Sequence, residues 1–187
     1  MTTDRAHDAR TTEALTLIPN DEFEAIFLEH WPRIYSVLCR LVGDPAEAED
    51  LALETFWQLH EHPPRVMDRL RLGGWLYRVA SNLGLNAIRG GKRRERYEID
   101  AGGWDPAQQA DRDDPVQQAA TAEQRRRVRQ VLTELSPRQA RLLVLRLSGL
   151  TYKELADALA VSPESIGTLL TRAEAEFERH WKEGGDE

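Results

Sequence analysis

One stretch of the sequence places an aromatic ring, amides and guanidinium groups on a single side of a predicted helix. These residues recur at steps of three or four: Trp75, Arg78, Asn82, Asn86, Arg89 and Arg93. Arginines hold phosphates, aromatic rings stack on bases, and amides can read the edge of an unpaired base. The pattern favours binding to single-stranded or melted DNA, an interpretation that the basic run from Lys92 to Arg96 strengthens. The alternative is a basic surface helix with a half-buried Trp75.

A second polar face is predicted near the C-terminal end, on the second of two short helices joined by a tight turn. Thr151 and Glu154 form a capping box, and Ser162 before Pro163 is expected to cap the next helix. This is the pattern of a helix-turn-helix, whose second helix enters the major groove, although an ordinary helical hairpin shares it. The residues expected to reach duplex DNA are Ser162, Pro163, Glu164, Ser165, Thr168, Thr171 and Arg172.

A third face is acidic and lies on a helix predicted to begin at Asp44. Its carboxylates and one amide recur at helical spacing without interleaved Lys or Arg: Glu47, Asp50, Glu54, Gln58 and Glu61. A charged face is usually only a solvated face, but the uniform sign of this one indicates a docking surface for a basic partner. His60 and His62 do not converge on one ion, so no metal site is expected. No nucleophile–base pair or phosphate loop is found, so we expect no catalytic residue and no cofactor.

The elements that must position these faces are all helical. A helix is predicted over 21–42, kinked or broken at Pro32 and ended by Gly43, and another over 44–61. A loop then leads to the helix of the basic stripe, which is expected to begin near Gly73. The sequence thus predicts an all-α protein with two small helical domains joined by a flexible acidic linker, the C-terminal domain holding the helix-turn-helix. The expected boundaries are a loose arm at 1–19, a domain at 20–96, the linker at 97–121 and a domain at 122–183.

The charge distribution agrees with a nucleic-acid binder despite a net charge of −7 over 187 residues. The stretch 78–96 has six basic residues and one acidic, whereas 97–122 has six acidic and one basic. Cys39 is the only cysteine, which excludes an internal disulfide. No apolar run is long enough for a membrane span and no leader opens the chain, so a cytoplasmic protein is expected.

Three segments together resemble the extracytoplasmic-function (ECF) class of bacterial sigma-70-type sigma factors. GDPAEAEDLALETFWQL is similar to the family pattern GDxxDAEDLxQExF, and GGWLYRVASNLGLNAIRGGKRR to WLYxIAxNxxxDxxR. LSPRQARLLVLRLSGLTYKELADALAVSPESIGTLLTRA resembles the family's last segment, LPxxxRxxxxLRxxxGxSyxEIAxxLgxsxgTVkSRLxRA. The resemblance covers about 21–182, nearly the whole chain.

The resemblance implies a non-enzymatic initiation subunit that binds core RNA polymerase and promoter DNA. It assigns contacts with the polymerase largest subunit to the acidic face, through Glu47, Asp50, Leu51, Glu54 and Gln58, and adds the second-largest subunit as a partner. It assigns the −10 element to Arg65, Asp68, Arg71, Trp75, Arg78, Asn82, Asn86, Arg89, Lys92 and Arg93. It assigns the −35 element to the helix 162–172, and it adds an anti-sigma factor as a candidate partner.

Three departures from the family pattern bear on promoter binding. The recognition helix keeps only Arg172 of the usual basic run, so weak binding to the −35 duplex is expected. Ala160 replaces the usual turn glycine, at a cost of about 1 kcal/mol if that residue is left-handed. Asn86 stands where the family has Asp. The alternative function is a helix-turn-helix regulator or sigma-like adaptor without initiation activity of its own.

Overall fold

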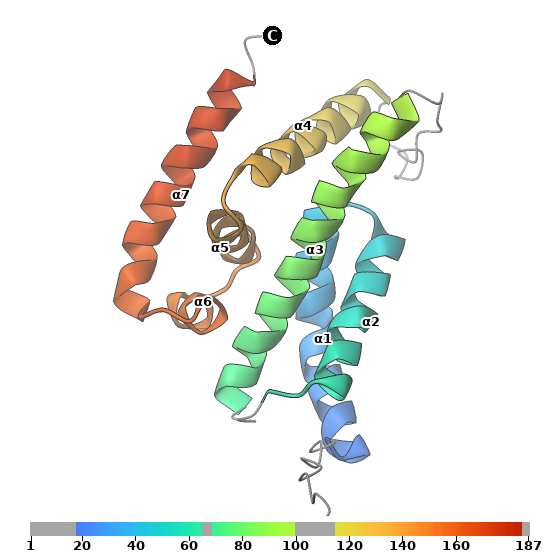
Figure 1. Cartoon of the computed structure of the whole chain (residues 1–187), viewed down its shortest axis with the longest axis vertical. Coiled ribbons are helices and arrows are strands. Elements are labelled where there is room, and N and C mark those ends of the chain that lie inside the picture. Colours follow the sequence, from blue (N-terminus) through green and yellow to red (C-terminus); the bar gives the residue numbers. More distant parts are fainter. Residues whose placement is uncertain (1–17, 65–68, 100–114, 185–187) are drawn as a thin grey trace, which may run out of the picture.

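The computed structural model describes residues 18–64, 69–99 and 115–184, with side chains over 18–64, 71–91 and 123–184. All regular secondary structure in these residues is helical, which confirms the all-α fold class. The helices, labelled in Figure 1, are α1 (Asn20–Val42), α2 (Pro45–Glu61), α3 (Arg69–Ile99), α4 (Pro115–Glu134), α5 (Pro137–Leu147), α6 (Tyr152–Leu159) and α7 (Pro163–Glu183). No helix in the described ranges is long and apolar enough to cross a membrane.

The ends of α1 and α2 are set by the residues that the sequence singled out. Gly43 adopts a left-handed conformation with φ of 82° and ends α1. The Asp44 side chain then accepts from the Glu47 amide at 2.9 Å and caps α2. Pro32 lies within α1 without breaking it, contrary to one of the two predicted outcomes. The carbonyl that loses its donor belongs to Leu28, whose residue is 66% exposed, so water can replace the missing amide.

In the second half of the chain, α6 begins at its predicted capping box and α5 begins at another. Ser136 with Gln139 and Thr151 with Glu154 form complete capping boxes at the starts of α5 and α6. Ser162 is the N-cap residue of α7, as predicted, but its side chain makes no cap hydrogen bond to a backbone amide of that helix. The Ser162 hydroxyl instead lies 3.0 Å from the Ser165 hydroxyl.

The long helix α3 lies between the two halves of the molecule (Figure 1). It packs against α1 and α2 on one side and against α5 and α6 on the other. Buried side chains from both halves form one continuous hydrophobic cluster, which includes Leu38 and Phe56 in the first half and Leu145 and Leu155 in the second. The two halves therefore share a core in this structure.

The helices differ from the sequence prediction at both sides of α3. This helix begins at Arg69 rather than near Gly73, so Arg71 is helical and not part of the preceding loop. α3 extends to Ile99 and α4 begins at Pro115, so both ends of the expected linker (97–121) are helical. Residues 100–114 and the arm 1–17 lie outside the described residues, and the domain boundaries remain a prediction.

Candidate nucleic-acid interface

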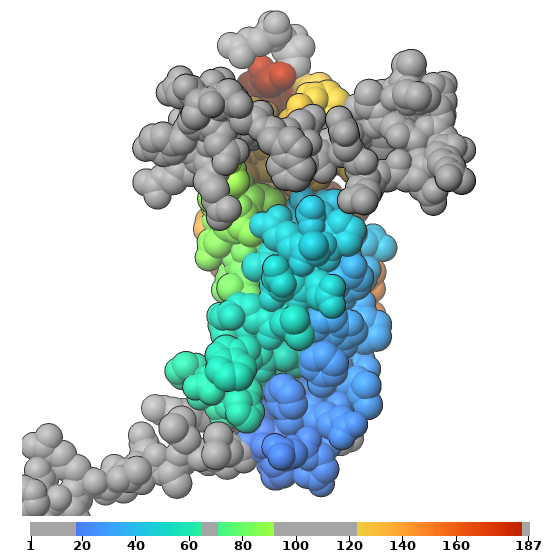
Figure 2. All heavy atoms as spheres, turned by 90° about the vertical axis from the view of Figure 1, so that its right-hand side faces the viewer, coloured from blue at the N-terminus to red at the C-terminus, as the bar shows by residue number. Residues whose placement is uncertain are grey.

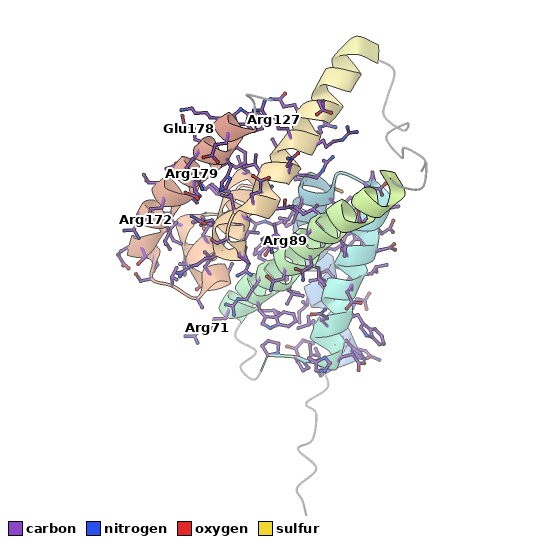
Figure 3. The ribbon with its side chains drawn as sticks, turned by 45° about the horizontal axis from the view of Figure 1, so that its top comes forward. Arg71, Arg89, Arg127, Arg172, Glu178 and Arg179 are labelled. Atoms are coloured by element: carbon purple, nitrogen blue, oxygen red, sulfur yellow. The ribbon has the colours of Figure 1, made fainter. Side chains whose placement is uncertain are left out.

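The first half of α7 presents a continuous polar surface to solvent. Packing on α5 and α6 is provided by Ile166, Leu170 and Ala173, all buried on the opposite side. The predicted duplex-binding residues are all exposed: Ser162, Pro163, Glu164, Ser165, Thr168, Thr171 and Arg172. Arg172 lies on the outer side of α7, away from α3 (Figure 3). Two basic residues further along α7 form ion pairs within the helix: Arg179 with Glu176 and Glu183, and Lys182 with Glu178.

A residue in an unfavourable backbone conformation sets the turn before this surface. Ala160 has φ of 54° and ψ of 52°, and it is the one non-glycine residue with positive φ among those described. The Ala160 amide bonds to the Asp157 carbonyl at 3.3 Å, and the Val161 amide to the Ala156 carbonyl at 3.0 Å. Ala160 therefore adopts the left-handed conformation that the family's glycine would adopt at no steric cost, and this conformation destabilises the turn when the residue is alanine.

The acidic face of α2 lies on the outside of the first half (Figure 2), where none of α4–α7 covers it. Glu47, Asp50 and Glu54 are exposed, while Leu51 and Gln58 are partly buried. Gln58 donates to Glu54 at 3.0 Å. A groove of about 630 Å³ lies beside these carboxylates.

The groove adds apolar residues that the sequence reasoning missed. It lies between α1 and α2 and is lined by Asn20, Phe23, Phe27, Asp50, Leu53, Glu54, Phe56, Trp57 and His60. Leu53 and Trp57 are 49% and 59% exposed, although both are large and apolar. Their position outside the buried face of α2 was the available signal, because an apolar residue on the solvent side of an amphipathic helix is unusual. The surface therefore combines an apolar floor with an acidic rim.

His60 packs against aromatic rings in this groove, with ring centroids 5.6 Å from Phe23 and 5.9 Å from Trp57. In the described part of the chain, no group of three or more His, Cys, Asp or Glu side chains could hold a metal ion.

Part of the basic face of α3 lies against the second half of the chain, although Asn82 and Asn86 on this face are exposed. We call Trp75, Arg78, Asn82, Asn86 and Arg89 the α3 stripe. Arg78 donates from Nε to the Ala158 carbonyl at 2.9 Å and from Nη2 to the Asp157 carbonyl at 3.2 Å. Arg89 donates to the Leu135 carbonyl at 3.3 Å, and Arg141 on α5 donates to the Asn82 side chain. Three of the five stripe residues, Arg78, Asn82 and Arg89, therefore form hydrogen bonds with the second half of the chain.

The remaining predicted −10 residues are distributed differently. Asn86 and Arg71 are exposed, and Trp75 is partly buried against the core. Figure 3 shows Arg71 at the N-terminal end of α3 and Arg89 further along the same helix. Arg65 and Asp68 lie outside the described residues, as do the side chains of Lys92 and Arg93. The assignment of all these residues to DNA remains a prediction.

Two titration shifts describe the electrostatics of these faces. The pKa of Glu164 is lowered, first by its own backbone amide and then by the Ser162 hydroxyl, so this carboxylate stays charged on the α7 surface. Burial, and secondly the nearby charge of Arg78, lowers the pKa of Arg141. The Arg141 Nε is buried without a hydrogen-bond partner in the described structure. Two neighbouring cations, Arg78 on α3 and Arg141 on α5, therefore lie at the contact between these helices.

Comparisons with known proteins identify two family models and several relatives that this chain resembles. Residues 26–94 match the family model for sigma-70 region 2, and residues 125–177 match that for sigma-70 region 4. The RNA polymerase sigma factor CarQ of Myxococcus xanthus is 29% identical over 161 residues, covering 85% of this chain and 87% of CarQ. The ECF RNA polymerase sigma factor SigG of Mycobacterium tuberculosis is 31% identical over 163 residues, covering 74% of this chain and 43% of SigG.

A solved structure of CnrH in complex with the cytosolic domain of CnrY gives a TM-score of 0.49 at 18% identity, covering 88% of this chain and 90% of that one. The two family models lie in the order region 2 and region 4, one on each side of the acidic segment, and each contains one of the predicted DNA-binding faces. This chain belongs to the sigma-70 family of RNA polymerase sigma factors, in its extracytoplasmic-function class.

Proposed function

We propose that this sigma factor binds core RNA polymerase through α2, the −35 element through the first half of α7 and the −10 element through the α3 stripe. The observation that supports the proposal best is that the polar face of α7 and the acidic face of α2 are both open to solvent on separate elements of one chain. A factor that recruits polymerase to a duplex site needs both surfaces at the same time.

The acidic face of α2 fits a basic, partly apolar partner helix. Carboxylates of Asp50 and Glu54 border a groove whose floor includes Phe23 and Trp57. Burial of exposed aromatic surface provides affinity, and the carboxylates on the rim select a partner of opposite charge. Core polymerase, through its largest subunit, is the partner proposed for this surface, and the second-largest subunit is a further contact.

The α7 surface is suited to reading duplex DNA with few phosphate contacts. Thr168, Thr171 and Ser165 offer short hydroxyl groups to base edges or phosphates, while Arg172 provides one cation. Because each neutralised phosphate contributes to the salt dependence of binding, a surface with one cation should bind the −35 duplex weakly and with a small salt slope.

Promoter opening follows from differential affinity. If the α3 stripe binds unpaired bases more tightly than paired ones, the free-energy difference shifts the duplex toward the open form. Trp75 provides a stacking surface, Asn82 and Asn86 provide amides, and Arg78 and Arg89 provide phosphate contacts. No chemical bond changes, so no catalytic group is required.

The second candidate function is a DNA-binding regulator or sigma-like adaptor that initiates nothing by itself. The observation that favours it is the engagement of Arg78 and Arg89 by the second half of the chain. In such a protein the α3 stripe would only hold the two halves together.

The experiment that separates these functions is transcription by purified core bacterial RNA polymerase with and without the protein, on fragments of the host genome. Start sites that need the protein would reveal the −10 and −35 sequences together. An Asp50→Lys variant should lose at least about tenfold in affinity for core polymerase, because it places a cation against a basic partner. Glu49→Lys is the matched control, since Glu49 is exposed on the same helix but lies about 100° further round, on the side away from Glu54.

Start sites that depend on the protein, together with a selective loss in Asp50→Lys, would support the proposal. A protein that binds core polymerase yet starts no transcript would favour the adaptor. A protein that does not bind core polymerase at all would refute the sigma-factor function.

A further inference from the structure

The groove between α1 and α2 leaves apolar surface open to solvent. On one side it is lined by Phe23 and Phe27 of α1. On the other side, Leu53 and Trp57 of α2 are 49% and 59% exposed. The ring centroids of Phe27 and Phe56 lie 4.8 Å apart, so the groove floor is continuous with the buried core. An open apolar surface with a charged rim indicates a binding site for another segment of chain.

The polypeptide enters α1 at the edge of this groove. Asn20, the first residue of α1, is one of the lining residues. Ile18, two residues earlier, is 5% exposed and belongs to the hydrophobic core cluster. The start of α1 lies at the same end of the molecule as the end of α2 (Figure 1). The residues that precede Ile18 are therefore tethered beside the groove.

The sequence before Ile18 contains two leucines at the spacing that suits an extended chain. Pro19 has φ of −55° and ψ of 144°, and a residue that precedes proline is restricted to extended conformations. Leu15 and Leu17 lie outside the described residues and are separated by Thr16. Because alternate residues of an extended chain point to the same side, a chain that continues in this form places both leucines on one face. Two leucines on one face match an apolar floor.

The groove is within reach of both leucines. An extended chain spans about 3.3 Å per residue, so Leu15 can lie up to about 17 Å from Asn20. The helical rise from Leu53 to Trp57 is only about 6 Å. The leucines can therefore lie along the floor with chain to spare.

Charge distinguishes this segment from a basic partner. Residues 1–17 contain two arginines and three carboxylates, so they bring no excess of positive charge to the rim formed by Asp50 and Glu54. Leucines in the groove would cover the apolar floor and leave both carboxylates unpaired. A partner that offers apolar and cationic groups together makes both kinds of contact, and it therefore displaces the segment.

We propose that in the free protein the segment 14–17 folds back into the α1–α2 groove through Leu15 and Leu17, and that core polymerase must displace it. The inference rests on the polymerase-binding function proposed for α2. Tethering beside the groove gives the segment an effective concentration in the millimolar range, so a weak apolar contact is sufficient for partial occupancy. The apparent affinity for polymerase is then reduced by the fraction of molecules whose groove is free.

The first test detects the contact itself by NMR on the full-length chain with labelled leucine methyl groups. We expect nuclear Overhauser effects (NOEs) from the methyl groups of Leu15 and Leu17 to the rings of Phe23 and Trp57. A mixture of labelled and unlabelled protein separates contacts within one chain from contacts between two copies.

The second test measures the affinity of the Leu15→Ser/Leu17→Ser variant for core RNA polymerase, by fluorescence anisotropy of a dye at the C-terminus. Neither leucine is among the predicted polymerase contacts. The variant should bind about fivefold more tightly than wild type, which corresponds to a groove covered in about four of five molecules. Ala6→Ser/Ala9→Ser is the matched control, because it adds two hydroxyl groups to the same segment away from the leucines, and it should bind as wild type does.

Absence of the methyl–ring NOEs would overturn the docking, and NOEs found only between different chains would assign the groove to a second copy instead. An unchanged polymerase affinity in Leu15→Ser/Leu17→Ser would overturn the competition, as would an equal gain in Ala6→Ser/Ala9→Ser. The NOEs do not depend on sigma activity. A protein that fails to bind core polymerase would therefore refute the proposed function, while the NOEs would still decide whether the segment occupies the groove.

Discussion

Replacing Ala160 with glycine should stabilise the protein by removing strain at the turn of the helix-turn-helix. Ala160 has φ of 54°, a conformation that costs an L-residue about 1–2 kcal/mol. Glycine removes this cost but adds freedom to the unfolded chain, which offsets about 0.4–1 kcal/mol. The residue is exposed, so loss of its methyl group sacrifices little packing. The net gain is about 1 kcal/mol, or about 2–4 °C in Tm for a chain of this size.

The assay is equilibrium unfolding in urea, followed by circular dichroism, with thermal unfolding in parallel. Ala175→Gly is the control, because Ala175 is exposed within α7 and the same substitution there should cost about 1 kcal/mol. The two variants should therefore move the midpoint in opposite directions. A loss of stability in Ala160→Gly comparable to that in Ala175→Gly would refute the argument from backbone strain.

The remaining predictions concern the helix caps and their titration. Thr151→Ala should cost about 1 kcal/mol, because the hydroxyl accepts from the Glu154 amide at 3.3 Å, whereas Ser162→Ala should cost much less, since the Ser162 side chain makes no cap hydrogen bond. Equal losses in urea unfolding would contradict this difference. Burial acts to raise the pKa of Glu154, but hydrogen bonds from the Thr151 amide and hydroxyl and from Arg33 lower it overall. The advantage of wild type over Glu154→Gln should thus be full above pH 4.5 and disappear as pH falls through the lowered pKa. A stability difference between wild type and Glu154→Gln that grows as pH falls would contradict this prediction.

Local signals in the sequence were sufficient for most helix starts and for the chemistry of each face. Asp44 and Thr151 cap helices as expected, because a cap depends on residues within one turn of each other. The exposed faces of α2 and α7 follow from helical periodicity for the same reason. The predictions fail in two places: the Ser162 hydroxyl contacts the Ser165 hydroxyl and not a backbone amide of α7, and α3 begins four residues before the predicted start.

The sequence by itself determined the all-α class, the three chemically distinct faces and the family, since each is written in residues close together in the chain. It could not show the groove beside Asp50, because Phe23 and Trp57 meet only when α1 packs on α2. It could not show that Arg78 is engaged either, since its acceptors lie 79 and 80 residues away on α6. A helical pattern identifies which side chains point outward from a helix, but it does not tell whether water or another helix meets them. The tertiary structure decided that Arg78 of the α3 stripe meets the second half, because Gly74 lets α6 approach closely enough for its terminal carbonyls to accept from Arg78.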